Sequence, residues 1–413
     1  MIQHLSSDTV VIGGGVVGLT IALTVARRHR SVILLDPEEP GSGASYGNAG
    51  TIADYAVLPV GTPDVLRQLP SLMFDRNSPL AIRHMALPSL APWLARFLRQ
   101  SLPAPARRNA QAIAALLGSA TRSWEDLAVE VEGTALLNRR GCLYAYETPQ
   151  AARAAETDMT FRRTLGVTVE LLSAAEFAAM EPSLPPMAGA AYFPKAIFLS
   201  DPGRMVALIA EAARKAGVQI VKARATGLER RVDGVIVSGR ALQIHGRRAV
   251  IAAGAHSRAL ALCAGDRVPL DTERGYHVEW DMAQPPLTRP TCPTARGFYL
   301  CPMAGRLRVA GTVELGGLTA RPSPHRIARL VAGARAIFPH LPEPTRSWMG
   351  FRPSMPDSLP VIGPSAAGPE ILHAYGHGHI GLTLAPITAR IVADLLDAKT
   401  PELDIAPYLP TRF

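Results

Sequence analysis

Three glycines, Gly13, Gly15 and Gly18, directly follow an apolar run at residues 9–12. At a turn from a strand into a helix, the first glycine permits the turn and the second lets a pyrophosphate approach the backbone. The third glycine lets helix and strand pack closely, and the N-terminus of the helix expected at residues 16–29 then faces the phosphates. The alternative interpretation is a glycine-rich turn that binds nothing.

A carboxylate follows at a distance that suits the same ligand. Asp36 ends a second apolar run at residues 31–36, 18 residues beyond Gly18. From this position a carboxylate can accept hydrogen bonds from the ribose hydroxyls of an adenosine. Strand, turn, helix, strand and acidic residue together predict a dinucleotide-binding unit.

Two histidines, His377 and His379, lie in a glycine-rich stretch at residues 376–381. Their H-x-H spacing is compatible with a metal, but no acidic residue or third histidine accompanies them, so no metal site is predicted. The four cysteines form no C-x-x-C pair, and they predict neither a zinc site nor a disulfide framework.

The composition excludes several classes of protein. The 413 residues suffice for two or three domains, and 48% hydrophobic with 19% charged residues is ordinary globular usage, which argues against a disordered or fibrous chain. No apolar run approaches the roughly 20 residues of a membrane span, and the polar start resembles no signal peptide, so we expect a cytoplasmic protein. The net charge of +9 would suit an anionic membrane surface or RNA, but the arginines are dispersed, and no nucleic-acid partner is predicted.

The segment at residues 93–99, which contains Trp93 and two arginines, has apolar side chains at helical spacing. It can be interpreted as a helix on a membrane surface or as an amphipathic helix packed on the domain, and the second interpretation is favoured. Another helix is expected at residues 109–132. A strand is expected at residues 140–146.

The strand–helix–strand rhythm returns at residues 201–221 and is followed by a strand at 249–255 that ends in small residues. Residues 265–315 instead predict antiparallel strands. We therefore expect an α/β protein with a Rossmann-like dinucleotide-binding domain and an inserted substrate domain, mainly an antiparallel sheet plus helices. The expected boundaries are 1–84, 150–260 and 350–413 for the first domain, and 85–149 and 261–349 for the second.

The chain resembles the FAD-dependent D-amino-acid oxidase superfamily over nearly its whole length. Within that superfamily it is most similar to bacterial D-amino-acid dehydrogenases of the small-subunit type and to hydroxy-D-proline dehydrogenases. The motifs that carry the resemblance are residues 11–18, 45–50, 73–80, 251–257, 350–363 (which begin Gly350-Phe351-Arg352-Pro353) and 376–386.

The resemblance implies FAD as the cofactor, with its ring lined by the segment that begins at Ser45. Some relatives hold the flavin through a cysteine just after the Arg-Pro motif; residues 354–359 contain none, which implies non-covalent FAD. The C-terminal glycine-rich loop would stabilise negative charge near flavin N1, unless it is a plain helix-start turn. The implied FAD-binding residues are Gly13, Gly15, Val16, Val17, Gly18, Asp36, Pro37, Ser45, Asn48, Gly50, Thr51, Ile52, Ala225, Ala253, Gly254, His377, Gly378, His379, Ile380, Gly381, Leu382 and Thr383.

The resemblance also implies a substrate site. Arg352 would pair bidentately with the substrate carboxylate, although a structural arginine is the alternative. Tyr299 matches a substrate-contacting tyrosine of related oxidases, or is a tyrosine half buried in a strand. Tyr276 would line the same pocket, with an ordinary strand face as its alternative, and His379 would lie above the flavin.

The implied reaction is the dehydrogenation of a D-amino acid or a cyclic imino acid such as D-proline or hydroxy-D-proline, by hydride transfer from Cα to flavin N5. A sarcosine- or glycine-type secondary amine oxidase is an alternative. So are the flavin subunit of a hetero-oligomeric dehydrogenase and a tRNA-modifying flavoprotein. The electron acceptor stays open between a quinone, oxygen and a partner protein, and peripheral contact with the inner face of the membrane is a further expectation.

Overall fold

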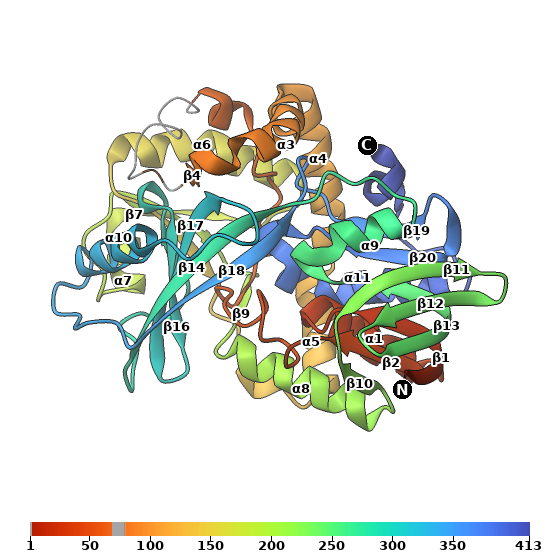
Figure 1. The fold of residues 1–413 in the computed structure, drawn as a ribbon. Coiled ribbons are helices and arrows are strands. Elements are labelled where there is room, and N and C mark those ends of the chain that lie inside the picture. Colours follow the sequence, from red (N-terminus) through yellow and green to blue (C-terminus); the bar gives the residue numbers. More distant parts are fainter. Residues whose placement is uncertain (1, 68–77, 79) are drawn as a thin grey trace.

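The computed structural model describes residues 2–67, 78 and 80–413, so most of the family motif at 73–80 lies outside the described residues. Within that part of the chain, two large sheets lie side by side, each with helices packed on it (Figure 1). The first sheet contains β1 (Gln3–Ile12), β2 (Val32–Asp36), β10 (Gln219–Lys222), β11 (Ala225–Arg231), β12 (Gly234–Gly239), β13 (Leu242–Ile251), β19 (Val361–Ser365) and β20 (Gly368–Tyr375).

The first sheet has a parallel centre. β1 pairs with β2 on one side and with β13 on the other, and β13 also pairs with β20. All three pairs are parallel. Continuous apolar runs form these strands because helices cover both faces of a parallel sheet. The helices packed on this half include α1 (Val16–Arg27), α4 (Pro103–Leu117), α5 (Ala120–Glu130), α8 (Pro202–Lys215), α9 (Ser257–Cys263) and α11 (Gly381–Leu396).

The strand–turn–helix prediction at the N-terminus is confirmed. Gly13 has φ +117°, a conformation that disfavours side chains, and β1 turns there into α1. A Cβ at Gly18 would lie 1.9 Å from the Gly13 carbonyl oxygen, so the third glycine is required for close packing. The helix ends at Arg27, two residues earlier than expected, and His29 has φ 60°.

The second sheet is mostly antiparallel, as expected. Long neighbouring strands from residues 271–354 form one side of it, and short strands from residues 142–193 form the other. Its strands are β4 (Leu80–Ile82), β6 (Cys142–Tyr146), β7 (Glu170–Ser173), β8 (Gly189–Phe193), β14 (Asp271–Asp281), β15 (Thr291–Pro293), β16 (Phe298–Met303), β17 (Arg306–Leu315) and β18 (Arg346–Ser354). The helices of this half include α6 (Pro149–Thr164), α7 (Ala174–Met180) and α10 (Pro324–Arg335).

A small sheet connects the two halves. Its strands are β3 (Thr51–Ile52), β5 (Leu137–Asn138) and β9 (Ile197–Leu199). Short 3₁₀ helices occur at η1 (His84–Ala86), η2 (Thr134–Leu136), η3 (Gly254–His256), η4 (Thr294–Arg296), η5 (Gly378–Ile380), η6 (Ala406–Tyr408) and η7 (Pro410–Arg412).

The sheet pairing divides the chain differently from the expected boundaries in two places. β7 and β8 belong to the second sheet, although residues 150–200 were expected in the first domain. Conversely, α4 and α5 bury Ile113, Leu116 and Trp124 in the core shared with α1 and α11. The single helix expected at 109–132 is two helices, because the first ends at Gly118.

α3 (Leu87–Gln100) decides between the two interpretations of the segment at residues 93–99. Trp93 and Phe97 are buried and pack with Leu90 and Leu315. The Trp93 indole N–H also donates to the Ser354 carbonyl at 3.3 Å. The helix is therefore packed on the domain by its apolar face.

One helical stretch in the described part of the chain, Gly378–Leu396, is long and apolar enough to cross a membrane. It comprises η5 and α11, and 72% of it is buried inside the protein, where α11 packs against α1 and α5. Burial of this kind marks it as a core helix of the first half.

Candidate active site

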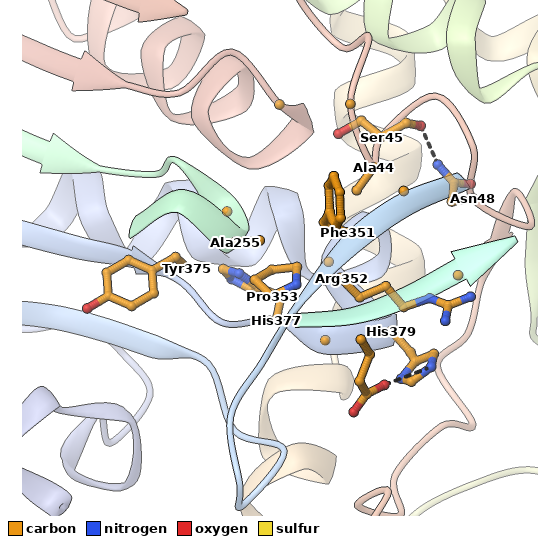
Figure 2. A pocket seen from close by; sticks show the side chains of 18 of the residues that line it. Ala44, Ser45, Asn48, Ala255, Phe351, Arg352, Pro353, Tyr375, His377 and His379 are labelled. Atoms are coloured by element: carbon orange, nitrogen blue, oxygen red, sulfur yellow. Dashed lines mark hydrogen bonds and ion pairs between the residues drawn. The ribbon is translucent and has the colours of Figure 1, made fainter. Parts of the chain in front are cut away.

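A cavity of about 1470 Å³ runs between the two halves and takes its walls from both. Figure 2 shows part of it, with Ser45 and Asn48 on one side and Arg352 and His379 further along. The expected site residues that line it are Gly13, Gly15, Val16, Val17, Asp36, Pro37, Ser45, Asn48, Thr51, Ala225, Ala253, Gly254, Tyr299, Arg352, His377, Gly378, His379, Ile380, Gly381 and Leu382.

The glycine turn forms one end of this cavity as a bare backbone surface. A Cβ at Gly13 would lie 2.3 Å from the Ala252 carbonyl oxygen, so no side chain can cover the turn at this point. The first turn of α1 presents N–H groups that have no partner within the helix. One of them, Val16 N–H, donates to the Ser45 hydroxyl at 2.8 Å. Ser45 thus lies at the start of α1, rather than only beside the expected flavin ring.

The Asp36 carboxylate shapes the glycine turn as well as lining the cavity. One oxygen accepts a hydrogen bond from Gly14 N–H at 2.6 Å and the other from Glu38 N–H at 2.9 Å. The remaining lone pairs of both oxygens can still accept ribose hydroxyl groups. Sequence reasoning assigned Asp36 only to the ribose and missed this hold on the turn.

Four of the expected cofactor residues do not line the cavity and instead hold together the segments that form its wall. Gly18 packs on the turn, as described above, and Ile52 is fully buried. Gly50 donates its N–H to the Asn48 side chain at 2.7 Å. The Thr383 hydroxyl accepts the N–H of Ala53 at 3.0 Å, which ties α11 to the segment after β3.

The two histidines of the H-x-H pattern diverge. His377 is buried and its Nε2 lies 3.0 Å from the Thr388 hydroxyl of α11. Burial lowers the pKa of His377 to about 3, so its ring is neutral at physiological pH. The Nε2 of His379 faces Glu273 instead. Among the described residues, no group of three metal-ligating side chains comes together here.

Arg352 lies in the cavity opposite Glu273, its register partner across β18 and β14. The guanidinium occupies the space above Gly275, where a Cβ would lie 2.3 Å from its Cζ atom. Nη1 donates to the Thr312 carbonyl at 3.1 Å. Burial lowers the pKa of Arg352, although an arginine of this kind still carries its charge. A half-buried cation therefore faces the cavity.

Three tyrosines surround another part of the wall. The Tyr299 hydroxyl lies 3.1 Å from that of Tyr144 and 3.4 Å from that of Tyr55, which in turn donates to the Cys142 sulfur at 3.0 Å. Burial raises the pKa of Tyr144 to about 12, so the phenols stay protonated. The sequence analysis did not assign Tyr55 or Tyr144 to the site. For Tyr144 the available signal was its place in an expected strand two positions after Cys142, because side chains two apart point to the same face.

Tyr276 does not line the cavity, which corrects its expected role. Side chains alternate along β14, so Glu273 and Gly275 face the cavity whereas Tyr276 faces the opposite side. Its hydroxyl lies 3.1 Å from Glu314 and accepts the N–H of Ser323 at 3.1 Å. Tyr276 is part of the core of the second half, which also follows from its 1% exposure.

The residues present fit an FAD. The cavity offers a glycine turn packed too closely on the backbone of residues 252–253 to accept a Cβ, a helix N-terminus and a carboxylate in the position expected for a ribose. It then continues past β3 to the start of α11, where the N–H groups of the first helical turn face it. A long cofactor with a pyrophosphate at one end and a ring at the other matches this sequence of groups.

Comparison with known proteins agrees with this geometry. Residues 8–395 match the FAD dependent oxidoreductase family, and the chain belongs to this family. It is an FAD-dependent oxidoreductase.

Two curated relatives and one crystal structure are similar over almost the whole chain. The D-amino-acid oxidase of Bradyrhizobium diazoefficiens is 37% identical, over 98% of both chains. The D-amino acid dehydrogenase 2 of Ralstonia nicotianae is 30% identical, over 97% of this chain and 99% of its own. The glycine oxidase of Geobacillus kaustophilus superposes with a TM-score of 0.80 at 26% identity, over 99% of both chains.

Proposed function

We propose that the protein oxidises the Cα–N bond of a D-amino acid or of a cyclic imino acid such as D-proline or hydroxy-D-proline. The observation that carries this proposal is the half-buried Arg352 cation that lines the same cavity as the glycine turn. The relatives named D-amino-acid oxidase and D-amino acid dehydrogenase support the substrate class.

Two polar side chains of the second half, Arg352 and Tyr299, bind the substrate in this proposal. The fork of Arg352 holds the substrate carboxylate through two parallel hydrogen bonds, in a geometry that a lysine cannot offer. The Tyr299 phenol, kept protonated by burial, would turn its hydrogen from the Tyr144 hydroxyl to the same carboxylate when substrate binds. Bound FAD supplies the two-electron oxidation by taking a hydride from Cα at N5. The protein orients Cα and excludes water from this part of the cavity.

A second candidate function is oxidation of glycine or of an N-methyl amine such as sarcosine. The similarity to a glycine oxidase structure favours it. Apolar side chains of α3, including Trp93, Leu94 and Phe97, also line the cavity and favour a substrate with a larger apolar side chain. We therefore place D-amino acids and cyclic imino acids first.

The cofactor is proposed to be non-covalent FAD. Acid or heat denaturation should release all of the flavin from the chain as FAD. Recovery of NAD alone, or flavin that stays on the denatured chain, would contradict this part of the proposal.

The location and the electron acceptor are proposed together. We place the protein in the cytoplasm, in weak contact with the inner face of the membrane where a quinone could be reduced, with oxygen and a partner protein as the other acceptors. Exposed Arg96 and Arg99 on α3 support electrostatic contact with anionic lipid, whereas buried Trp93 cannot insert. Sedimentation with anionic vesicles at low salt tests it, and failure to sediment would leave a soluble acceptor.

The substrate assignment is tested by flavin bleaching. The purified protein is mixed without oxygen with D-amino acids, L-amino acids, D-proline, hydroxy-D-prolines, glycine and sarcosine. Fast bleaching by a D-amino acid or a D-imino acid is the expected result. Preference for glycine or sarcosine would favour the second candidate, and bleaching by none of them would contradict both.

A further inference from the structure

Glu273 is a buried side chain at the cavity wall; burial raises its pKa, and one of its two carboxyl oxygens has no hydrogen-bond partner in the described part of the chain. Its residue is 4% exposed, and its Oε2 has no hydrogen bond to any described residue. An unpartnered carboxylate oxygen in a protein interior is costly, so such groups usually face a donor or a ligand. Glu273 lines the cavity, but Oε2 itself is closed to solvent, so this oxygen acts on a ligand through the side chain that lies between them.

His379 faces this oxygen. Its Nε2 lies 3.4 Å from Glu273 Oε2, and its side chain, 36% exposed, lines the cavity. Burial and the Arg352 cation lower the pKa of His379, so the imidazole is neutral in the empty cavity, and a substrate carboxylate that neutralises Arg352 favours its protonation. When Nε2 carries the hydrogen toward Glu273, Nδ1 has a lone pair that no described residue occupies. Figure 2 shows His379 and Arg352 on the same side of the cavity.

The surrounding charges can be counted element by element. β14 contributes Glu273, β18 contributes the Arg352 cation, and the start of α11 contributes His379 and the neutral His377. Arg274 and Glu314 face the other side of β14, where they pair with each other. One half-buried cation and one buried carboxyl group thus flank a neutral imidazole. This arrangement suits a zwitterion, whose carboxylate meets Arg352 and whose ammonium meets the imidazole that Glu273 holds.

We propose that Glu273 and His379 form a pair that takes the proton which the substrate's ammonium group must lose before oxidation. The proposal rests on the proposed function, because it requires an amino acid on Arg352. His379 is the catalytic residue of the pair, since its Nδ1 meets the substrate nitrogen. Glu273 is a positioning residue, which holds the ring and stabilises the imidazolium that forms.

Only a proton moves in this step. An N–H bond of the ammonium breaks, its electron pair stays on nitrogen as the amine lone pair, and a new N–H bond forms at His379 Nδ1. Bound FAD would then supply the two-electron oxidation of the neutral amine, in which the Cα hydrogen is lost with its electron pair and the nitrogen lone pair forms the C=N bond. The proton on His379 passes to solvent when the product leaves.

The first test compares the pH dependence of anaerobic flavin reduction in the holoenzyme and in Glu273→Gln and His379→Gln. Without the pair, the reaction depends on substrate that is already neutral in water. We expect both variants to lose on the order of 100-fold near pH 7 and to recover as the pH rises toward the ammonium pKa of the substrate. The matched control is Glu181→Gln, a buried carboxylate outside the cavity that pairs with Arg289, and its pH profile should equal that of the wild type.

The second test does not depend on turnover. 2-Amino-2-methylpropanoate has a carboxylate and an ammonium group but no Cα hydrogen, so it can bind without being oxidised. Calorimetry in two buffers of different ionisation enthalpy measures the protons released on binding. The wild type should release close to none, because the pair keeps the proton, whereas Glu273→Gln should release close to one per ligand bound as the amine.

These outcomes separate the two proposals. A wild-type pH profile in both variants overturns the proton-accepting role, even if amino acids remain the substrates. A uniform loss at every pH in both variants also overturns it, because it would mean that the groups only shape the site. If Glu273→Gln does not fold, the same decision is made on His379→Gln, whose side chain is partly exposed. If the wild type oxidises no amino acid, the proposed function itself fails.

Discussion

The two ends of the cavity are built by different means. At the phosphate end, a turn, a helix and one carboxylate within residues 13–36 provide most of the groups that line the cavity, and many of these are backbone atoms. At the substrate end, side chains from positions 55 to 379 meet because strands of the second sheet bring them together. The first end is therefore a local property of the sequence, and the second is a property of strand pairing.

This difference explains what the sequence could predict. Gly13, Gly15 and Gly18 lie at the turn and helix start that the sequence predicts, and Asp36 ends β2, because these positions depend on neighbours in the chain. Tyr276 was misplaced because a strand alternates faces, and only the pairing shows which face meets the cavity. The resemblance implied that Arg352 lies in the substrate pocket. Nothing in the local sequence indicated that residue 275 must be a glycine because the Arg352 guanidinium occupies the space of its Cβ.

Residues outside any motif were the hardest to predict. Glu273 precedes Arg274 in an ordinary strand, and its significance arises only from burial beside His379 and opposite Arg352. The expected domain boundaries differ from the sheet pairing for a similar reason, since helices 103–130 pack on one half while the strands after them join the other. Composition does not carry such information.

The largest expected effect concerns the contact between the two regions. Glu279 of β14 is buried and pairs with the buried Arg308 and with the less buried Arg306 and Arg346, and Arg308 donates to the carbonyls of residues 46 and 48. Glu279→Gln would leave the buried Arg308 cation without its counter-charge, at a cost of about 3–5 kcal/mol in the free energy of unfolding. We expect a large fall in Tm at pH 7 with weaker FAD retention, which thermal unfolding and flavin content measure.

The same residue predicts a pH dependence. Burial raises the pKa of Glu279, but the guanidinium groups of Arg308 and Arg346 outweigh it and lower the pKa to about 2. A lowered pKa in the folded state adds stability above the unfolded value of about 4.5, which is lost as the pH falls from there toward 2. The Tm difference between wild type and Glu279→Gln should shrink over this window. A constant difference would show that the charge of Glu279 contributes nothing.

The next effect isolates the substrate end. Arg352→Ala leaves a substrate carboxylate unpaired, and removal of such a buried charge-assisted pair costs roughly 2–5 kcal/mol, or on the order of 30-fold to several thousand-fold in kcat/KM. FAD content should not change, because Arg352 belongs to the other region. Steady-state kinetics with the best amino acid measures the loss.

Two controls accompany Arg352→Ala. Arg352→Lys keeps the charge without the fork and should fall between the wild type and the alanine variant. An amine that lacks the carboxylate should be oxidised equally by all three proteins. Near wild-type efficiency of Arg352→Ala on its amino acid would remove the main support for the substrate assignment.

The smallest effect isolates the phosphate end. A Cβ at Gly18 would lie 1.9 Å from the Gly13 carbonyl oxygen and 3.4 Å from Ala252 Cβ, and backbone cannot move aside as a flexible side chain can. Gly18→Ala should push α1 from the turn, at a cost of about 1–3 kcal/mol. We expect weaker FAD binding and a lower Tm, but an unchanged KM for the amino acid in the fraction that retains FAD.

Gly118→Ala is the matched control for that substitution, because its Cβ would make only ordinary contacts of 3.7–3.8 Å and its φ is −56°. It should leave both FAD affinity and KM as in the wild type. If Gly18→Ala instead raised the KM strongly while FAD binding stayed intact, the two ends of the cavity would be coupled through α1. The glycine turn would then control the substrate site as well as the cofactor, and the division between a local end and a strand-assembled end would be wrong.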